Sequence, residues 1–246
     1  MSVLVTGATD GIGKEVARLL VARGARVVLH GRTLEKAEGA RADVGAERAV
    51  AADLASLDDV RALAASDAVG DVDVLVNNAG VFMKKRTLTK DGREMTMAVN
   101  HDAPFLLTHL LLAKLARVVN TSSVAHNRGR VDVHDLDFAR GFDGSSAYAS
   151  SKLANVLFTV ELARRAPRVL VNALHPGVVS TKLLRTGFGM NGPDSLTEGA
   201  ATSVHLAVDD VHASGKYFVD SREYPPQRAA FDLDLCFELY EASCIR

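Results

Sequence analysis

The sequence predicts an α/β protein with a doubly wound parallel sheet, and three observations support this fold class. Short apolar runs alternate with longer helical patterns along the 246 residues. The short runs are apolar throughout, which is typical of strands covered by helices on both faces. A glycine-rich segment follows the first run directly, at a strand-to-helix turn. Alternating strands and helices over this length favour a parallel sheet with helices on both sides.

Seven strands, six helices between them and a C-terminal helix are predicted along the chain. The strands are expected at Val3–Thr6, Arg26–His30, Arg48–Ala51, Val72–Val76, Arg117–Thr121, Val169–Ala173 and Tyr217–Val219. The helices are expected at residues 11–23, 34–42, 56–68, 92–115, 146–166 and 195–208. The segment 231–242 has an amphipathic helical pattern, and we expect it to pack on the core rather than cap a site or meet a partner subunit.

One domain is expected to span residues 1–246, because no linker-like or low-complexity stretch divides the chain. Two longer loops, 124–145 and 176–194, each follow a predicted strand. In an open α/β sheet, ligands bind beyond the carboxyl ends of the strands. These two loops are therefore expected to line the substrate site.

The composition is that of a soluble globular protein and excludes several classes of function. The chain has 48% hydrophobic residues and a net charge of −1, without the basic clusters that nucleic-acid or anionic-membrane binding needs. The first strand-like run starts at Ser2, so no signal peptide is expected, and no apolar run is long enough to cross a bilayer. We interpret Cys236 and Cys244 as free thiols. A cytoplasmic protein that binds neither nucleic acid nor a membrane is therefore expected.

The first predicted strand-to-helix turn is rich in glycine. The segment reads TGATDGIG, with Gly7, Gly11 and Gly13 spaced T-G-x-x-x-G-x-G. Glycine allows a sharp turn and a close approach of the backbone to a diphosphate, which would lie against the helix N-terminus. The pattern therefore predicts a dinucleotide-binding turn, and the alternative is a turn that uses glycine for packing alone.

The segment after the second predicted strand bears on the type of dinucleotide. NAD-binding folds usually place an acidic residue there to hold the ribose 2′-hydroxyl. This segment reads VVLHGRTLEK, with no acidic residue before Glu35, and Arg32 is placed to pair with a 2′-phosphate. The segment favours NADP over NAD, and a solvated loop arginine is the alternative.

Polar residues also follow the third and fourth predicted strands. Asp53 is positioned to accept a hydrogen bond from an adenine amino group. Asn77 and Asn78 can join neighbouring strand ends through their amides, although asparagines at strand ends are often only turn formers. Ala79 and Gly80 leave room for a cofactor.

The segment SSAYASSKLANV places Tyr148 and Lys152 four residues apart. On a helix, both side chains would leave the same face, one turn apart. This spacing alone does not distinguish acid–base machinery from an ordinary polar helix face.

Together these motifs resemble those of the short-chain dehydrogenase/reductase family. The matching segments are TGATDGIG (6–13), NNAG (77–80), VN (99–100), VVNTSS (118–123), YASSK (148–152) and HPGVVST (175–181), in the family's order. Longer stretches, including VVNTSSVAHNRGRVDVHDLDF and YASSKLANVLFTVELARR, are similar to the retinol dehydrogenase-like group. The resemblance implies a Rossmann-type sheet of seven parallel strands and reversible hydride transfer between NADP(H) and a carbonyl/alcohol pair, with NAD as the alternative cofactor. It also implies a homodimer or homotetramer formed through the helices at 92–115 and 146–166.

The resemblance assigns site residues by position. Its catalytic set corresponds to Asn100, Ser123, Tyr148 and Lys152, with Ser123 preferred over the adjacent Ser122. Its cofactor-binding set corresponds to Gly7, Asp10, Gly11, Ile12, Gly13, Arg32, Asp53, Leu54, Asn78, Ala79, Gly80, Tyr148, Lys152, Pro176, Gly177, Val179 and Thr181. No metal site is expected, because the loop residues His126, His134, Asp135 and Asp137 lack ligand spacing.

Hydride transfer to a carbonyl needs a proton donor, and the resemblance assigns this role to Tyr148. A free tyrosine has a pKa near 10. We expect a Lys152 ammonium at about 4–5 Å to stabilise the phenolate by roughly 3–4 kcal/mol and so to lower the pKa of Tyr148 by about 2–3 units. Ser123 would donate a hydrogen bond to the substrate oxygen, and Asn100 would hold a water that links Lys152 to solvent.

Departures and alternatives qualify this assignment. Asp10 stands where many NADP-dependent members carry a basic residue, and we expect no counterpart of the N-terminal membrane segment that several relatives carry. A dinucleotide-binding redox sensor without turnover is the alternative function, although a sensor would be expected to have lost Tyr148 or Lys152. Apolar loop residues suggest a lipophilic substrate, with local packing as the alternative. They are Phe82, Met83, Phe138, Phe142, Leu183, Leu184, Phe188 and Met190.

Overall fold

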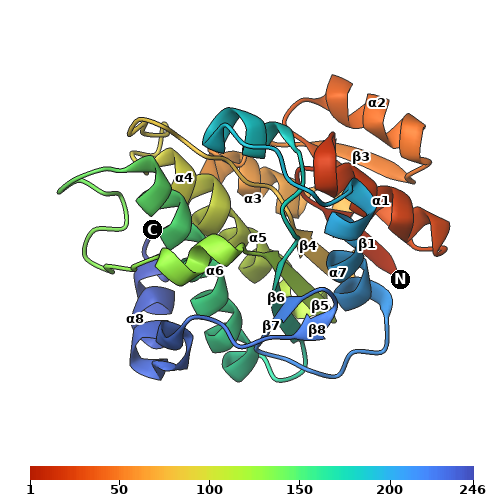
Figure 1. Cartoon of the computed structure of the whole chain (residues 1–246). Helices are drawn as coiled ribbons and strands as arrows, with labels where there is room; N and C mark the ends of the chain where they lie inside the picture. The colour runs from red at the N-terminus through yellow and green to blue at the C-terminus, as the bar shows by residue number, and fades with distance from the viewer.

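A computed structural model describes residues 1–246, and its centre is one eight-stranded sheet between helices (Figure 1). The strand order is β3-β2-β1-β4-β5-β6-β7-β8. β1 to β7 run parallel, and β8 runs antiparallel to β7. The strands are β1 (Ser2–Val5), β2 (Arg26–Gly31), β3 (Arg48–Ala51), β4 (Val74–Asn77), β5 (Arg117–Thr121), β6 (Leu170–His175), β7 (Lys216–Val219) and β8 (Arg222–Glu223).

The helices follow the predicted order, with short additional turns. They are α1 (Gly11–Ala22), α2 (Leu34–Val44), α3 (Leu57–Ala65), α4 (Met95–Met97), α5 (Ala103–Leu111), α6 (Gly144–Arg165), α7 (Leu196–Val208) and α8 (Leu233–Cys244). The short 3₁₀ turns are η1 (Asp67–Val69), η3 (Leu112–Lys114), η4 (Val124–Arg128) and η6 (Arg228–Phe231). Two π-helical segments are η2 (Ala98–Asp102) and η5 (Leu184–Phe188).

The apolar side chains of each strand pack on both faces of the sheet, as β1 shows. Val3 and Val5 pack in one hydrophobic cluster with α1, α2 and α7. Leu4 packs in another cluster with α3, α5 and α6 on the opposite face. All three side chains are fully buried. Because successive strand residues point to opposite faces, a continuous apolar run is needed when helices cover both sides.

The eighth strand corrects the prediction of seven. Asp220 and Ser221 adopt positive φ angles of 49° and 59°, and the chain returns beside β7 with Val219 opposite Arg222. Two-residue hairpin turns of this kind usually carry Asn-Gly or Asp-Gly. Asp-Ser has no glycine, and β8 is only two residues long, so the pattern gave little indication of this strand.

The helix predicted over residues 92–115 is present from Met95 to Lys114, but not all of its turns are α-helical. It begins at Met95, where the Glu94 side chain caps it by accepting a hydrogen bond from Met97 N. The π-helical turn η2 follows, then α5 with a proline in its first turn, and then the 3₁₀ turn η3. π-helical turns occur often at functional sites, and Asn100 lies within this one.

The C-terminal helix packs on the core, as predicted. Cys236 and Leu239 of α8 join Leu153 and Leu157 of α6 in a buried cluster, and Figure 1 shows α8 on the outside of α6. Most of α6 is buried, because it packs on the sheet and on η4 as well as on α8. Association through α6 stays a prediction, and α8 already covers much of that helix within the chain. Both cysteines are free thiols.

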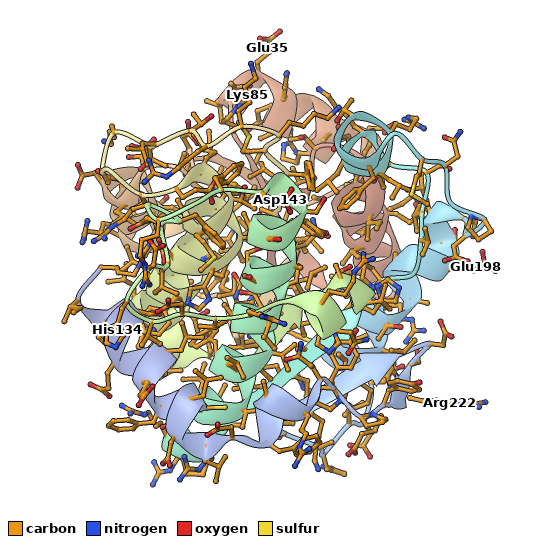
Figure 2. The ribbon with its side chains drawn as sticks, turned by 60° about the vertical axis from the view of Figure 1, so that its left-hand side comes forward. Glu35, Lys85, His134, Asp143, Glu198 and Arg222 are labelled. Atoms are coloured by element: carbon orange, nitrogen blue, oxygen red, sulfur yellow. The ribbon has the colours of Figure 1, made fainter.

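The surface is charged on all sides of the view in Figure 2, where Glu35, Lys85, Glu198 and Arg222 project outward. None of the helices combines the length and the apolar character needed to cross a bilayer. The two large clusters of buried apolar side chains lie on the two faces of the sheet.

Candidate active site

The glycine-rich turn after β1 forms part of one large cavity of about 600 Å³ at the carboxyl edge of the sheet. Gly7 and Gly11 have positive φ angles of 62° and 54°, a region that favours glycine. A Cβ atom on Gly13 would overlap the Asn78 amide and the Gly7 carbonyl oxygen, so α1 lies too close to β1 for any side chain there. The Asp10 side chain makes no capping hydrogen bond, which leaves the first N–H groups of α1 free for an anion.

Buried side chains fix the shape of this turn. His30 Nδ1 accepts a hydrogen bond from Gly7 N at 3.1 Å, so Nε2 carries the proton and donates it to Ala52 O at 3.1 Å. Burial lowers the pKa of His30 to about 4, which keeps the ring neutral. Asn78 Nδ2 donates to Thr6 O at 2.9 Å and Gly7 O at 3.2 Å. Sequence reasoning missed His30, although a histidine inside an apolar strand was an available indication.

Basic side chains mark the β2 side of the cavity. Arg32, just beyond β2, and Lys36, in the first turn of α2, both line it. Glu38 and Asp43 of α2 pair with other basic residues, so neither Arg32 nor Lys36 is neutralised by them. Lys36 was not predicted, although its spacing of four residues from Arg32 places both near the helix start. Two free cations here match a phosphate on the ribose.

Amide side chains join the strand ends beneath the cavity, as predicted. Asn77 Nδ2 donates to Asn120 Oδ1 of the neighbouring β5 at 2.9 Å and to Thr108 Oγ1 at 3.1 Å. Asn120 Nδ2 donates onward to Thr159 Oγ1 of α6 at 2.9 Å. All of these groups are buried. This network fixes the spacing between β4, β5 and α6.

Tyr148, Ser123 and Lys152 meet at the β5 side of the same cavity. Tyr148 and Lys152 share a face of α6, and the Lys152 Nζ atom lies 5.7 Å from the centre of the Tyr148 ring. Nζ donates a hydrogen bond to the buried Thr121 carbonyl oxygen at 2.9 Å. Both serines of the pair line the cavity. The Ser122 hydroxyl donates a hydrogen bond to Lys152 O at 2.7 Å, so Ser123 is the better placed of the two to contact a substrate.

Asn100 is the predicted site residue that does not line the cavity. It is fully buried, and its amide accepts from Val81 N at 2.8 Å and donates to Val81 O at 3.0 Å and to Ser151 Oγ at 3.0 Å. These bonds hold the segment after β4 against α6. A Cβ atom on Gly80 would lie 3.5 Å from both Asn100 Oδ1 and Lys152 Nζ, an ordinary van der Waals distance, so both groups lie next to this glycine. The water expected at Asn100 stays a prediction.

Burial controls the protonation of the tyrosine–lysine pair. It raises the pKa of Tyr148 to about 12, with the Ser123 hydroxyl acting in the opposite direction. It lowers the pKa of Lys152 to about 8. The expectation that Lys152 lowers the pKa of Tyr148 is therefore wrong for these two groups in the protein alone. Removal from water is the largest cause of the shift at Tyr148 and the cause of the shift at Lys152.

Every residue of the predicted cofactor-binding set lines this one cavity. Beyond β6, Gly177 has a φ of 84°, and a Cβ atom on it would lie 2.6 Å from the Asp194 carboxylate. That carboxylate accepts from Val178 N at 2.5 Å, which holds the segment after β6 in place. Thr181 is one turn further along and is close to Gly11. The polar atom His175 Nδ1, also at this edge, is buried without a hydrogen-bond partner.

Aromatic side chains stand over Tyr148. Its ring centre lies 5.7 Å from that of Phe82 and 5.3 Å from that of Phe188, and the two phenylalanines are 4.5 Å apart. Leu183, Leu184 and Met190 line the same end of the cavity. The loop 176–194 therefore contributes the apolar wall that was expected of it.

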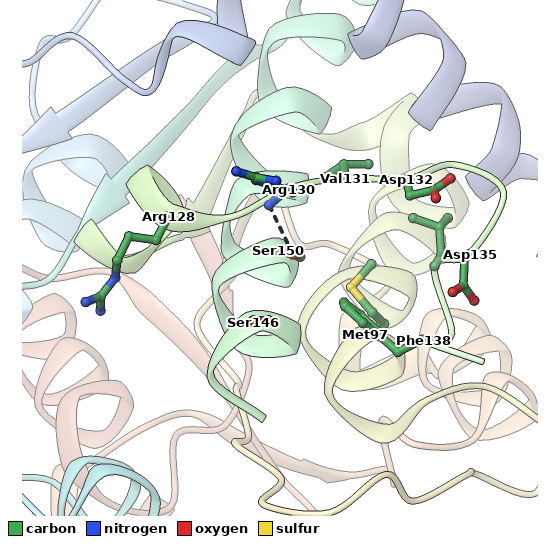
Figure 3. Close-up of a pocket in the computed structure, with 10 residues that line it drawn as sticks. Met97, Arg128, Arg130, Val131, Asp132, Asp135, Phe138, Ser146 and Ser150 are labelled. Carbon is green, nitrogen blue, oxygen red and sulfur yellow. Dashed lines mark hydrogen bonds between the residues drawn. The ribbon is translucent and has the colours of Figure 1, made fainter. Parts of the chain in front are cut away.

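The loop 124–145 contributes less than predicted. Val124, Ala125 and Arg128 line the main cavity, but the later part of the loop covers the other side of α6. There, Phe138 lines a second cavity of about 400 Å³ beside Met97 and Ser150 (Figure 3). The loop is long enough to pass around α6, so its two halves face different cavities.

A buried hydrogen-bond chain links the site to α8. Lys152 shares the Thr121 carbonyl with Asn155, whose Nδ2 atom lies 3.4 Å from it. Asn155 Oδ1 in turn lies 3.4 Å from His101 Nδ1, and His101 Nε2 lies 2.9 Å from Ser243 Oγ. Burial lowers the pKa of His101 to about 4, so this ring is neutral.

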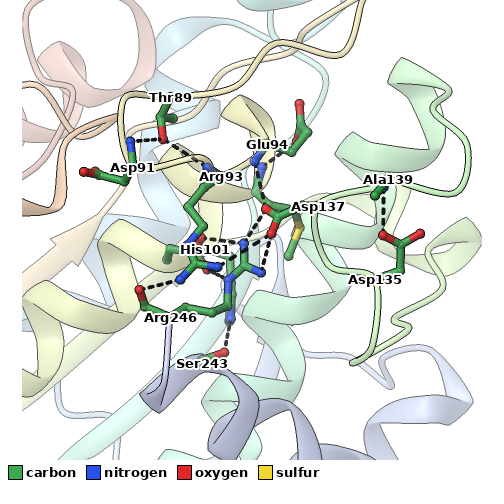
Figure 4. A network of polar contacts seen from close by, with 12 residues as sticks. Thr89, Asp91, Arg93, Glu94, His101, Asp135, Asp137, Ala139, Ser243 and Arg246 are labelled. Atoms are coloured by element: carbon green, nitrogen blue, oxygen red, sulfur yellow. Dashed lines mark hydrogen bonds and ion pairs between the residues drawn. The ribbon is translucent and has the colours of Figure 1, made fainter.

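Arg246 forms a buried double ion pair next to this chain (Figure 4). Its guanidinium donates two hydrogen bonds to Asp102 at 2.9 and 3.0 Å and two to Asp137 at 2.7 and 3.0 Å. Asp102 ends the π-helical turn that contains Asn100. Burial raises the pKa of Asp137, but the bonds from Arg246 outweigh it and keep that pKa below its usual value.

The histidines and acidic residues of the long loop do not assemble a metal site. His126 is buried and bonded to Gln227 N, while His134 projects at the edge of the molecule (Figure 2). No group of three or more His, Cys, Asp or Glu side chains has an arrangement that could hold a metal ion.

Known proteins share this fold and these motifs. The family model described as short chain dehydrogenase matches residues 1–188. Retinol dehydrogenase 12 of Bos taurus is 40% identical over 267 residues, covering 98% of this chain and 84% of that protein. A protein of Streptomyces sp. (strain C5) named as a daunorubicin C-13 ketoreductase is 41% identical, covering 98% of this chain and 91% of its own length. The crystal structure of a short chain dehydrogenase from Burkholderia cenocepacia J2315 in complex with NADP has a TM-score of 0.71 at 29% identity, covering 88% of this chain and 94% of that one.

These similarities extend over nearly the whole chain, and they agree with the single, mostly parallel sheet flanked by helices. The named relatives act by oxidation or reduction, and this chain is an NAD(P)-dependent oxidoreductase. The chain belongs to the short-chain dehydrogenase/reductase family, in its retinol dehydrogenase-like group.

Proposed function

We propose that this protein uses NADP(H) to interconvert a lipophilic carbonyl compound and its alcohol, with Tyr148 as the proton donor and acceptor. One observation carries the proposal: a single cavity joins the glycine-rich turn and two free basic residues to Tyr148 and Ser123. A nucleotide held at one side would therefore share a space with an acid–base pair at the other.

The cavity has the features that a phosphorylated dinucleotide requires. The free N-terminus of α1 suits a diphosphate, and the close contact at Gly13 leaves no side chain in its way. Arg32 and Lys36 suit a 2′-phosphate, and Asp53, which lines the same cavity after β3, suits an adenine amino group. A bound nicotinamide supplies or accepts the hydride, which no protein side chain can do.

The side chains of this chain supply the proton and the charge stabilisation. Because the pKa of Tyr148 is raised to about 12, its phenol stays protonated at neutral pH and is ready to donate to an alkoxide oxygen. Ser123 is placed to donate a hydrogen bond to the same oxygen. Lys152 remains charged below a pH of about 8 and would replenish the proton through the groups that contact it. These protonation states favour carbonyl reduction.

The apolar end of the cavity supports a lipophilic substrate. Phe188, Leu183 and Leu184 line it close to Tyr148, and Phe82 packs on both rings. An apolar body bound there would exclude water from the carbonyl carbon during transfer. Two relatives are named for retinol and for the C-13 ketone of daunorubicin, which are molecules with large apolar bodies.

A substrate panel tests this function. Wild-type protein should oxidise NADPH when aldehydes or ketones with apolar bodies are supplied. Tyr148→Phe should lower kcat by at least about a hundredfold, because a positioned general acid contributes that much, while NADPH binding is retained. Tight NADPH binding by the wild type without turnover of any compound would instead support a redox sensor.

A further inference from the structure

Arg128 has an unusual position next to the proposed substrate site. It ends the short turn η4, which begins directly after Ser123, and it lines the main cavity together with Val124 and Ala125. Arg128 also lines the second cavity, but Figure 3 shows its side chain on the other side of α6 from Met97 and Asp135. Arg128 is the first charged side chain after Ser123 in the chain.

The guanidinium of Arg128 has no carboxylate partner within the protein. The acidic residues that line the main cavity are Asp10 and Asp53, and both belong to the nucleotide side, after β1 and β3. In the same long loop, by contrast, Arg140 pairs with Asp132 and Asp135. The loop thus contains its own acids, and they neutralise a different arginine.

The backbone on both sides of Arg128 is held rigidly. Gln227 Nε2 donates to the carbonyl oxygens of His126, Asn127 and Gly129, each at 3.0 Å. A Cβ atom on Gly129 would lie 2.5 Å from a backbone oxygen of α6, so the turn also packs tightly on that helix. A fixed backbone reduces the entropy that the side chain loses on binding a ligand. The turn therefore presents an unpaired cation at a defined place.

We propose that Arg128 binds a carboxylate on the substrate, so that the preferred substrate is an amphipathic oxo acid. Its carbonyl would reach Tyr148, its apolar body would lie along Phe188 and Leu183, and its carboxylate would pair with Arg128 at the mouth of the cavity. A guanidinium matches a carboxylate with two parallel hydrogen bonds. Lys182 lines the same cavity and adds a second positive charge. This inference rests on the proposed function and names its substrate class.

A matched pair of substrates tests the inference. A series of ω-oxo carboxylic acids of increasing length is compared with the corresponding methyl esters, using NADPH and measuring kcat/KM for each. The wild type should favour the acid at one chain length, and Arg128→Ala should reduce the acid-to-ester ratio by about five- to tenfold. Arg128→Lys should recover part of the ratio, and added salt should lower it in the wild type.

Arg130→Ala is the control, because Arg130 is also exposed, lies two residues away and lines only the second cavity. It should leave the acid-to-ester ratio unchanged. Equal acid-to-ester ratios in wild type and Arg128→Ala would overturn the inference while leaving the reductase function intact.

A binding measurement decides the inference even without turnover. If neither acid nor ester is reduced, the proposed reaction fails for these compounds, and calorimetric binding of the matching alkanoic acids then decides the role of Arg128. Weaker binding to Arg128→Ala than to Arg130→Ala supports a carboxylate site. Equal binding to both variants overturns it.

Discussion

Lys152 is a buried cation without a carboxylate partner, and this governs the behaviour of the site at the residue scale. Its Nζ atom is bonded to the Thr121 carbonyl and lies over the Tyr148 ring. The carbonyl dipole compensates only part of the lost hydration, so the pKa of Lys152 falls to about 8. Because Lys152 loses its proton near pH 8, both the activity and the stability of the protein should depend on pH in this range.

Carbonyl reduction should decline as pH rises through about 8, because Lys152 then loses its charge. Tyr148, with its pKa raised to about 12, stays protonated across this range and adds no titration of its own. The profile of kcat/KM against pH in wild type and Lys152→Arg tests this. The arginine stays protonated, so its decline should move to higher pH. A decline at the same pH in both proteins would assign it to another group.

Lys152 should also lower the stability of the folded protein at neutral pH. Its folded-state pKa of about 8 lies below the ordinary value of 10.5, so between these values the unfolded chain binds a proton that the folded chain has released. Stability from this group therefore rises with pH from about 8 to about 10.5. Lys152→Met should be more stable than wild type at pH 7, by up to about 3 kcal/mol, and this advantage should shrink at pH 10.

Urea unfolding at the two pH values measures this difference. Lys36→Met is the control, because Lys36 is exposed, and its substitution should not change the free energy of unfolding at either pH. Equal free energies of unfolding for wild type and Lys152→Met at pH 7 would contradict the claim that the buried, charged Lys152 destabilises the folded protein.

At the scale of elements, strands and helices were predictable where local pattern and burial agree. β1, β2 and β5 are buried on both faces, so their apolar runs were visible in the sequence. β8 was not, because it has two exposed residues and an Asp-Ser turn. The π-helical turn η2 was also hidden, and its Asn100 bonds to Val81, nineteen residues earlier in the chain, which no local pattern indicates.

The site residues likewise separate into those that a local sequence pattern indicates and those that only the folded structure brings together. The glycines and the Tyr148–Lys152 pair are local patterns, so their positions around one cavity could be predicted. Contacts made across the sheet could not, and these include the support of Gly7 by His30 and the clamp of Gln227 on the turn before Arg128. The pKa of Tyr148 was misjudged for a related reason, because spacing indicates a neighbouring charge but not the depth of burial.

The β2–α2 junction should determine the choice between NADPH and NADH. Arg32→Ala and Lys36→Ala should each weaken NADPH binding by about tenfold, with little effect on NADH, because only NADPH has a 2′-phosphate to lose these contacts. Fluorescence titration with both dinucleotides measures the difference. Arg41→Ala, which removes a basic residue of α2 already paired with Glu38, is the matched control. Equal losses for both dinucleotides in Arg32→Ala would remove the argument for NADP.

At the scale of the whole molecule, α8 and Arg246 join the C-terminal segment to the part of the fold that contains Asn100. Arg246 bridges Asp102, at the end of η2, and Asp137, in the long loop, while Ser243 contacts His101. Residues more than a hundred positions apart are therefore held in one polar cluster. This arrangement stabilises the side of α6 that faces away from the main cavity.

Arg246→Met should destabilise the protein by about 3–5 kcal/mol, because it leaves the buried Asp102 carboxylate without its cation and Asp137 with only the longer Arg93 pair at 3.7 Å. The midpoint of thermal unfolding measures this loss. Arg222→Met changes an exposed arginine of β8 and should shift the midpoint very little. Similar midpoints for the two variants would show that the Arg246 pairs contribute no net stability.

The central claim is hydride transfer to a carbonyl carbon with proton donation by Tyr148, and isotope transfer tests it most directly. Deuterated NADPH is incubated with a carbonyl substrate, and mass spectrometry measures deuterium on the carbinol carbon of the product. Wild-type protein should form this labelled alcohol, and Tyr148→Phe should still bind NADPH yet form almost none. Labelled alcohol made at the same rate by Tyr148→Phe would contradict the assigned role of Tyr148.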